Sequence, residues 1–133
     1  MNTLSGTIIQ TEQQGQLMLV HVQLGTHLLK SIVIETPTSA PYLAVNQKVQ
    51  LLFKETEVII AKGPEKAISL QNRLNCSIIG IDKGRLLSRL LLACGPDRLA
   101  SVITSHAVDQ LGLEIGDPVC AMIKTNELML APC

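Results

Sequence analysis

Two lysines stand at matching places in this chain, each at the end of a β-rich run and each followed by a polar residue and a nearby glutamate. Lys54 ends the run 48–54, and Lys124 ends the run 118–124. A single lysine at a strand end is most simply a solvated charge. The two lysines, however, occupy the same point of a repeat. The alternative interpretation is that both bind a ligand, because an ammonium group is a compact cationic donor.

Two further segments carry hydrogen-bond donors. Ser69, Leu70 and Gln71 precede a β-rich run, and Thr104 and Ser105 open a helical turn whose first backbone N–H groups lack partners within the helix. One cation, several hydroxyls and amides, and backbone donors are the groups that a small oxyanion requires. For Thr104 the competing interpretation is an N-cap without a ligand.

The seven residues considered as an oxyanion site are Lys54, Ser69, Leu70, Gln71, Thr104, Ser105 and Lys124.

Residues for catalysis are not grouped in any recognisable pattern. His21, His27 and His106 are scattered, and the sequence contains neither a nucleophile elbow nor a paired Cys-His signature. Phosphate-cradling glycine loops are also absent. We therefore expect a protein that is not an enzyme and that needs no cofactor.

Composition argues against nucleic-acid binding. The 133 residues include 11 Lys+Arg and 11 Asp+Glu, and the only aromatic residues are Tyr42 and Phe53. Binders of single strands combine a basic groove with aromatic stacking platforms, and DNA readers carry a basic recognition element. A DNA-binding regulator is therefore disfavoured. Because 47% of the residues are hydrophobic, the chain can build a core, mostly from aliphatic side chains.

The chain begins without a basic segment followed by an apolar one, and no apolar run approaches the ~20 residues that cross a bilayer. Its four cysteines, Cys76, Cys94, Cys120 and Cys133, form no CxxC pair. Zinc ligation and a secreted disulfide framework both fit this spacing poorly. We expect reduced cysteines that pack as small hydrophobic residues, no protein-ligated metal, no membrane contact and a cytoplasmic location.

The chain is an internal repeat with an offset of 70 residues and no gap. Asn2 matches Asn72, Leu4 matches Leu74, and the segment 52–58 matches 122–128. We divide the chain into a first module, 1–62, a turn-rich linker, 63–67, and a second module, 68–133.

Within each module the hydrophobic period is that of strands. The expected strands cover residues 5–11, 17–24, 28–34, 48–54, 57–61, 76–82, 86–94, 98–103, 118–124 and 127–131. Residues 104–112 indicate a short capped helix, and the counterpart 36–43 begins similarly but carries two prolines. The pattern predicts a mostly β protein with two tandem OB-like five-stranded antiparallel barrels, each with a short helix.

Three separated motifs resemble one known family. Ser69–Leu74 is similar to the Ser-Ala-Arg-Asn-x-Leu opening of molybdate- and tungstate-binding modules, the molbindins with their TOBE or Mop domain. Ile103–Asp117 is similar to that family's Ile-Thr…Leu-Gly-Leu-x-x-Gly-Asp stretch, and Ala121–Thr125 to its Ala-x-Ile-Lys strand. The motifs occur in family order, and the match covers 68–131 well and 2–61 more loosely.

The resemblance implies roles for individual residues. Ser69 would donate its hydroxyl, Leu70 its backbone N–H and Lys124 its ammonium, and Thr104 would join from a neighbouring subunit or module. Gln71 stands where many members have arginine.

Other positions also depart from the family pattern. Ala107 stands where an anion-binding serine is common, and Cys76 replaces a glycine. The first module lacks the Ser-Ala-Arg element but keeps Lys54, with Thr36, Thr38 and Ser39 in the equivalent loop.

The resemblance further implies a homo-oligomer with strand exchange. The leading hypothesis is that the protein binds molybdate or tungstate, without catalysis, for storage, homeostasis or sensing. The alternative is a protein-interaction or regulatory module that has lost anion binding and docks on a transporter ATPase or a regulator.

Overall fold

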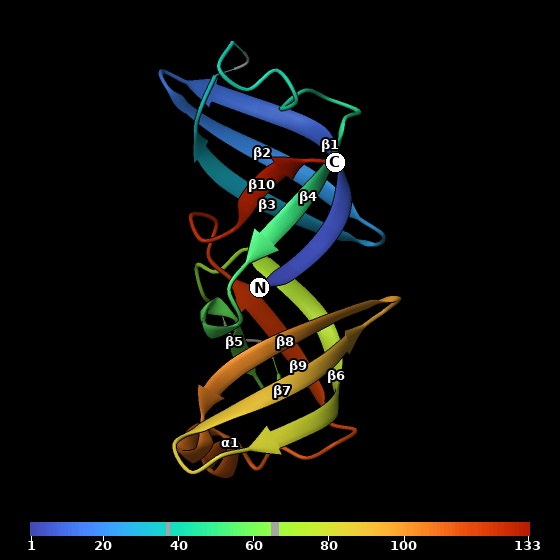
Figure 1. The fold of residues 1–133 in the computed structure, drawn as a ribbon, viewed down its shortest axis with the longest axis vertical. Coiled ribbons are helices and arrows are strands. Elements are labelled where there is room, and N and C mark those ends of the chain that lie inside the picture. Colours follow the sequence, from blue (N-terminus) through green and yellow to red (C-terminus); the bar gives the residue numbers. More distant parts are fainter. Residues whose placement is uncertain (37, 65–66) are drawn as a thin grey trace.

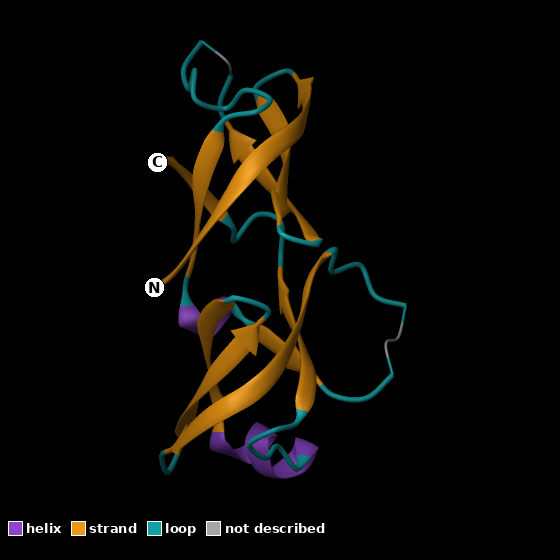
Figure 2. Cartoon of the chain, turned by 90° about the vertical axis from the view of Figure 1, so that its right-hand side faces the viewer, coloured by secondary structure: helices purple, strands orange, loops and turns teal. Residues whose placement is uncertain are grey.

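The computed structural model describes residues 1–36, 38–64 and 67–133. Ten strands, one short α-helix and one 3-10 turn make up these parts (Figures 1 and 2). In chain order they are β1 (Asn2–Gln14), β2 (Leu17–Leu24), β3 (His27–Ile34), β4 (Lys48–Phe53), η1 (Glu55–Glu57), β5 (Ile59–Ala61), β6 (Asn72–Lys83), β7 (Leu87–Cys94), β8 (Asp97–Thr104), α1 (Ser105–Leu111), β9 (Pro118–Ile123) and β10 (Met129–Pro132).

The strands form two five-stranded antiparallel sheets that exchange their last strands. One sheet has the order β10-β4-β1-β2-β3, and the other has the order β5-β9-β6-β7-β8. The red strand β10 accordingly lies among the blue and green strands of the first repeat, and β5 lies in the half built from the second repeat (Figure 1). Each sheet is therefore completed by a strand from the other repeat.

The architecture confirms the expected tandem of OB-like β modules, and the strand positions follow the alternating pattern. Along β7, for example, Ser88, Leu90, Leu92 and Cys94 are buried while their neighbours face outward. The buried aliphatic residues of both repeats join one hydrophobic cluster, in which Phe53 is fully buried. In both repeats the first strand has a bulge at the same place, between Ile8 and Gln10 and between Ile78 and Gly80. Such bulges add the bend that a curled sheet needs.

Two buried asparagines bind the edge strand of the opposite repeat. The Asn72 side chain donates to the Lys30 carbonyl (2.8 Å) and accepts from the Lys30 N–H (2.7 Å) on β3. Asn2 makes the equivalent pair of bonds with Ala100 on β8, both at 2.8 Å. Because β3 and β8 are sheet edges, these amides satisfy backbone groups that would otherwise lack a strand partner.

Two buried serines make a second pair of symmetric contacts. The Ser31 hydroxyl on β3 donates to the Leu128 carbonyl, and the Ser101 hydroxyl on β8 donates to the Val58 carbonyl at 2.9 Å. Each serine thus ties an edge strand to the segment that leads into the exchanged strand of the other repeat. The exchange is held by hydrogen bonds of buried groups as well as by the shared core.

The expected helix of the second repeat is present. The Thr104 hydroxyl accepts from the Ala107 N–H (3.1 Å) as its N-cap, and Gly112 ends it in the left-handed conformation at φ 60°. The counterpart in the first repeat differs from the expectation, because its described residues form turns. Of its two prolines, Pro41 lies in these turns, and Pro37 is outside the described residues. Residues 65 and 66 of the expected linker are also outside them.

The expectation that all four cysteines are reduced is wrong in the structure, where Cys76 and Cys94 form a disulfide. These residues lie on the adjacent strands β6 and β7, next to the cross-strand pair of Ser77 and Ala93, and their Cα atoms are 4.3 Å apart. Strand register, which cysteine spacing does not reveal, brings them together. No helix in the described part of the chain is long and apolar enough to cross a membrane.

Two glutamates at equivalent repeat positions meet where the modules join. The turn before β5 is closed by the Glu57 N–H donating to the Lys54 carbonyl (3.0 Å), and the turn before β10 by Glu127 and Lys124 (3.1 Å). The protonated Glu127 carboxyl donates a hydrogen bond to the Glu57 carboxylate, which raises the pKa of Glu127. Burial and the Glu57 charge raise this pKa further, and the Lys124 charge lowers it.

Replacing Asn72 with alanine is expected to lower the free energy of unfolding by about 2–4 kcal/mol, because the N–H and C=O of Lys30 both lose their partner. Urea unfolding followed by circular dichroism measures this change. Asn75→Ala, at an exposed position on the same strand, is the control and should change stability little. Equal effects of the two variants would contradict the role given to Asn72.

Replacing Glu127 with glutamine is expected to raise the melting temperature at pH ~7, since it mimics the protonated carboxyl without its charge. A raised folded-state pKa gives stability that is present below the unfolded pKa and lost as pH rises through the folded pKa. The gain should therefore vanish below pH ~4, where the wild-type carboxyl is protonated as well. Glu114→Gln, on the exposed loop before β9, is the control. A gain that does not depend on pH would refute this explanation.

Candidate oxyanion-binding site

A cavity of about 360 Å³ lies where the two repeats meet. Its lining residues are Leu19, Ile32, Ser69, Leu70, Gln71, Lys124 and Thr125. The structure thus brings together four of the seven residues that the sequence singled out, from two segments more than fifty positions apart. The remaining wall comes from the first repeat.

The segment carrying Ser69 and Leu70 is fixed by an arginine. The Arg73 guanidinium on β6 donates through Nε to the Leu70 carbonyl (2.8 Å) and through Nη2 to the Ile68 carbonyl (3.1 Å). These carbonyls are thereby turned toward Arg73. The resulting loop precedes β6 and presents the exposed side chains of Ser69 and Gln71 at the cavity.

Lys124 and Thr125 are positioned by the turn that follows β9. The Ile32 N–H on β3 donates to the Thr125 carbonyl (3.0 Å), which anchors the turn to the first repeat. Lys124 is exposed, and among the described residues no acidic side chain forms an ion pair with it. Its ammonium is therefore not held in a close ion pair, although its charge acts on the nearby Glu127 carboxyl.

The donor set suits an oxyanion. The cavity lining offers the Lys124 ammonium, the hydroxyls of Ser69 and Thr125 and the carboxamide N–H groups of Gln71, and it includes no carboxylate. Leu19 and Ile32 supply an apolar wall, which lowers the local dielectric and strengthens charge-assisted hydrogen bonds. In the described parts of the chain, no group of three or more His, Cys, Asp or Glu side chains is placed to hold a metal ion.

Thr104 and Ser105 lie elsewhere. Thr104 is exposed at the end of β8, where it caps α1. Ser105 is buried; its hydroxyl donates to the Gly84 carbonyl (2.6 Å) and lies 2.8 Å from the Ser88 hydroxyl. Neither residue lines the cavity of its own chain, and the Ser105 hydroxyl is already hydrogen-bonded to groups within the fold.

Lys54 occupies the equivalent place in the other half of the molecule, just before η1. There the Glu55 carboxylate accepts from Arg89 Nε at 2.8 Å, and this bond lowers the pKa of Glu55. In the loop after β3, Thr36 and Ser39 bond to each other, with the Thr36 N–H donating to the Ser39 hydroxyl at 2.8 Å.

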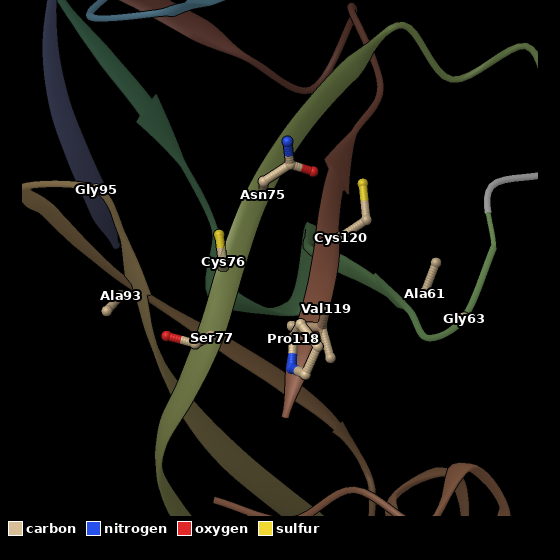
Figure 3. A pocket seen from close by; sticks show the side chains of 10 residues that line it. All are labelled: Ala61, Gly63, Asn75, Cys76, Ser77, Ala93, Gly95, Pro118, Val119 and Cys120. Carbon is tan, nitrogen blue, oxygen red and sulfur yellow. The ribbon is translucent and has the colours of Figure 1, made fainter. Parts of the chain in front are cut away.

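Another cavity, of about 580 Å³, lies beside β6 and β9 (Figure 3). Its labelled side chains are small or apolar with two neutral polar groups, Asn75 and Ser77, and no basic residue lines it. Despite its larger size, this cavity lacks the cation that a dianion needs, so its chemistry does not match an oxyanion site.

Sequence reasoning did not single out Leu19, Ile32 or Thr125 as lining residues. Thr125 directly follows Lys124, and its hydroxyl could have been recognised as a donor. Leu19 and Ile32 come from the first repeat, and they reach the cavity only because the modules exchange strands.

The family model of the TOBE domain matches residues 1–60 and 68–130. The molybdenum-pterin-binding protein MopA of Rhodobacter capsulatus is 30% identical over 107 residues, which cover 79% of this chain and 40% of MopA. The molybdenum import ATP-binding protein ModC of Brucella abortus is 35% identical over 77 residues, 57% of this chain. That match spans only 21% of ModC, about a fifth of its length.

A solved structure covers nearly the whole chain. The cytoplasmic molybdate-binding protein ModG, crystallised with molybdate bound, superimposes with a TM-score of 0.93 at 25% sequence identity, over 99% of this chain and 96% of ModG. The family match and the shared tandem fold lead to one conclusion: this chain belongs to the TOBE domain family, with two copies of the domain in tandem.

Proposed function

We propose that this protein binds molybdate or tungstate without catalysis, in the cytoplasm, for storage, homeostasis or sensing. The observation that carries the proposal is the cavity between the repeats, where Ser69, Gln71 and Lys124 converge with no carboxylate among the lining residues. Similarity to ModG, which was crystallised with molybdate, and to MopA supports the choice of ligand.

The donor set also explains how the ligand is selected. A molybdate or tungstate dianion only accepts hydrogen bonds, whereas hydrogen phosphate carries an O–H that needs an acceptor. A shell of donors therefore disfavours phosphate. Three or four charge-assisted hydrogen bonds of ~1.5–3 kcal/mol each are enough for micromolar affinity, about −8 kcal/mol. Sulfate has the same charge and a smaller radius, so the spacing of the donors must exclude it.

Thr104 joins the site, in this proposal, from a neighbouring copy of the chain. Large apolar side chains on the outer faces of the sheets support assembly, because Leu17 and Leu87, at equivalent repeat positions, are 50% and 57% exposed. Strand exchange within the chain already completes both sheets. Because each sheet already has its exchanged strand, copies of the chain would assemble through the outer sheet faces that carry Leu17 and Leu87.

Thermal unfolding with ~1 mM molybdate, tungstate or sulfate tests the proposal. Molybdate or tungstate should raise the melting temperature by several degrees, since a ligand that binds the native state stabilises it by about 4 kcal/mol at ~1,000 times its dissociation constant. Sulfate should have little effect. Lys124→Ala should remove most of the shift, because it removes the cation of the cavity.

Lys48→Ala is the matched control, since Lys48 is exposed at the start of β4 and does not line the cavity. It should keep the full shift. If Lys124→Ala binds as well as the wild type, the proposed site is wrong. If no oxyanion shifts the wild type, the alternative of a docking module for a transporter ATPase or a regulator is favoured.

Light scattering of the purified protein is expected to give a multiple of the chain mass of 14.4 kDa. Thr104→Ala should weaken tungstate binding in that assembly, because the neighbouring copy supplies this hydroxyl. The matched control is His106→Ala, on the exposed side of the same helix. A monomeric protein with full affinity would contradict the contribution of a second copy.

A further inference from the structure

The segment that carries candidate donors before β6 is held by an arginine and not by a neighbouring strand. Residues 67–71 belong to no helix or strand. The half-buried Arg73 on β6 donates to the Leu70 carbonyl through Nε (2.8 Å) and to the Ile68 carbonyl through Nη2 (3.1 Å). One rigid, planar guanidinium therefore binds two peptide groups of this segment at once.

The planarity of the peptide group fixes the direction of the next N–H groups. In a trans peptide the C=O and the following N–H point in opposite directions, and the described residues contain no cis peptide bond. Because the Ile68 and Leu70 carbonyls point to Arg73, the N–H groups of Ser69 and Gln71 point away from it. In the described parts of the chain, neither of these N–H groups donates to a backbone carbonyl.

The side of the segment opposite Arg73 is the side of the cavity. Ser69, Leu70 and Gln71 line the cavity together with Lys124, whereas Arg73 is not among its lining residues. N–H groups that point away from Arg73 therefore point toward the cavity. Backbone N–H groups that converge in this way are good donors to an anion, because no side-chain freedom is lost when they bind.

We propose that Arg73 is a positioning residue of the oxyanion site, which keeps the backbone N–H groups of Ser69 and Gln71 directed at the ligand without touching the ligand itself. The inference rests on the function proposed for the Lys124 cavity. It adds two preformed donors to the side-chain groups of that cavity. Donors that are already in place need not reorganise when the anion arrives, so binding requires less ordering of the segment.

The role requires the shape of arginine as well as its charge. A guanidinium presents several N–H groups in one plane and reaches both carbonyls, whereas the lysine ammonium is a compact point charge on a flexible chain. Arg73→Lys therefore keeps the charge and loses the double contact, and Arg73→Met loses both. Arg73→Lys also keeps the inference testable where methionine disturbs the fold.

Isothermal titration calorimetry of the full chain with sodium tungstate measures the effect on affinity. Arg73→Met and Arg73→Lys are both expected to weaken binding about tenfold or more, because the freed segment lets its N–H donors turn away from the anion. Arg98→Met is the matched control, since Arg98 Nη1 also donates to two carbonyls, of Gly95 (3.3 Å) and Asp97 (3.1 Å), but does not line the cavity. It should bind like the wild type.

Amide NMR spectra give a readout that a general loss of stability would not reproduce. In the wild type, saturating tungstate should shift the amide proton signals of Ser69 and Gln71 downfield, since a hydrogen bond to an anion deshields the proton. At equal saturation these two shifts should be much smaller in Arg73→Lys, which still carries the positive charge. Arg98→Met should show the shifts of the wild type.

The outcomes separate this inference from the proposed function. If the wild type binds tungstate and Lys124→Ala does not, while both Arg73 variants bind like the wild type, the positioning role is refuted and the Lys124 cavity stands. Full affinity in Arg73→Lys with a loss in Arg73→Met would also overturn the inference, because charge alone would then suffice. A wild type that binds no tungstate refutes both proposals.

Discussion

The exchange of the last strand between the two repeats is the constraint on which the rest of the structure depends. Strand β10 completes the sheet of the first repeat, and β5 completes that of the second. The chain crosses from one sheet to the other before β5 and again before β10. Buried asparagine and serine side chains hydrogen-bond to backbone groups of the other repeat and so satisfy them. Neither module can therefore form its full sheet and core without the other.

The Lys124 cavity is a product of this crossing. The turn that carries Lys124 lies between β9 in one sheet and β10 in the other, and the Thr125 carbonyl accepts from Ile32 on β3 as the chain passes. Lys124 thus lies in a turn that contacts both repeats. A change that loosened the exchange would move Lys124 relative to Ser69, so the stability of the fold and the geometry of the proposed site are coupled.

Much of this architecture could be predicted from the sequence, because strand alternation and a gapless repeat are local patterns. The family motifs singled out Ser69, Gln71 and Lys124, and the structure places these three residues around one cavity. The resemblance implied strand exchange between copies, but the exchange between the two repeats of one chain could not be predicted, since β5 and β10 have the same pattern whichever sheet they join. The disulfide of Cys76 and Cys94 was missed because it depends on strand register.

Tandem duplication also explains why the two halves can differ so much at equivalent positions. An apolar residue beside a neutral one, Leu19 with Thr125, leaves an open cavity whose lining carries a single positive charge. At the equivalent positions of the other half, Arg89 and Glu55 form an ion pair, with Arg89 Nε 2.8 Å from Glu55 Oε1. Each member of this pair has a further neighbour of opposite charge, since the N-terminal ammonium of Met1 lies 3.6 Å from Glu55 Oε2 and the Asp82 charge acts on Arg89. The two repeats therefore share the backbone turn at this joint, closed by the same hydrogen bond, and differ in the charges that they carry on it.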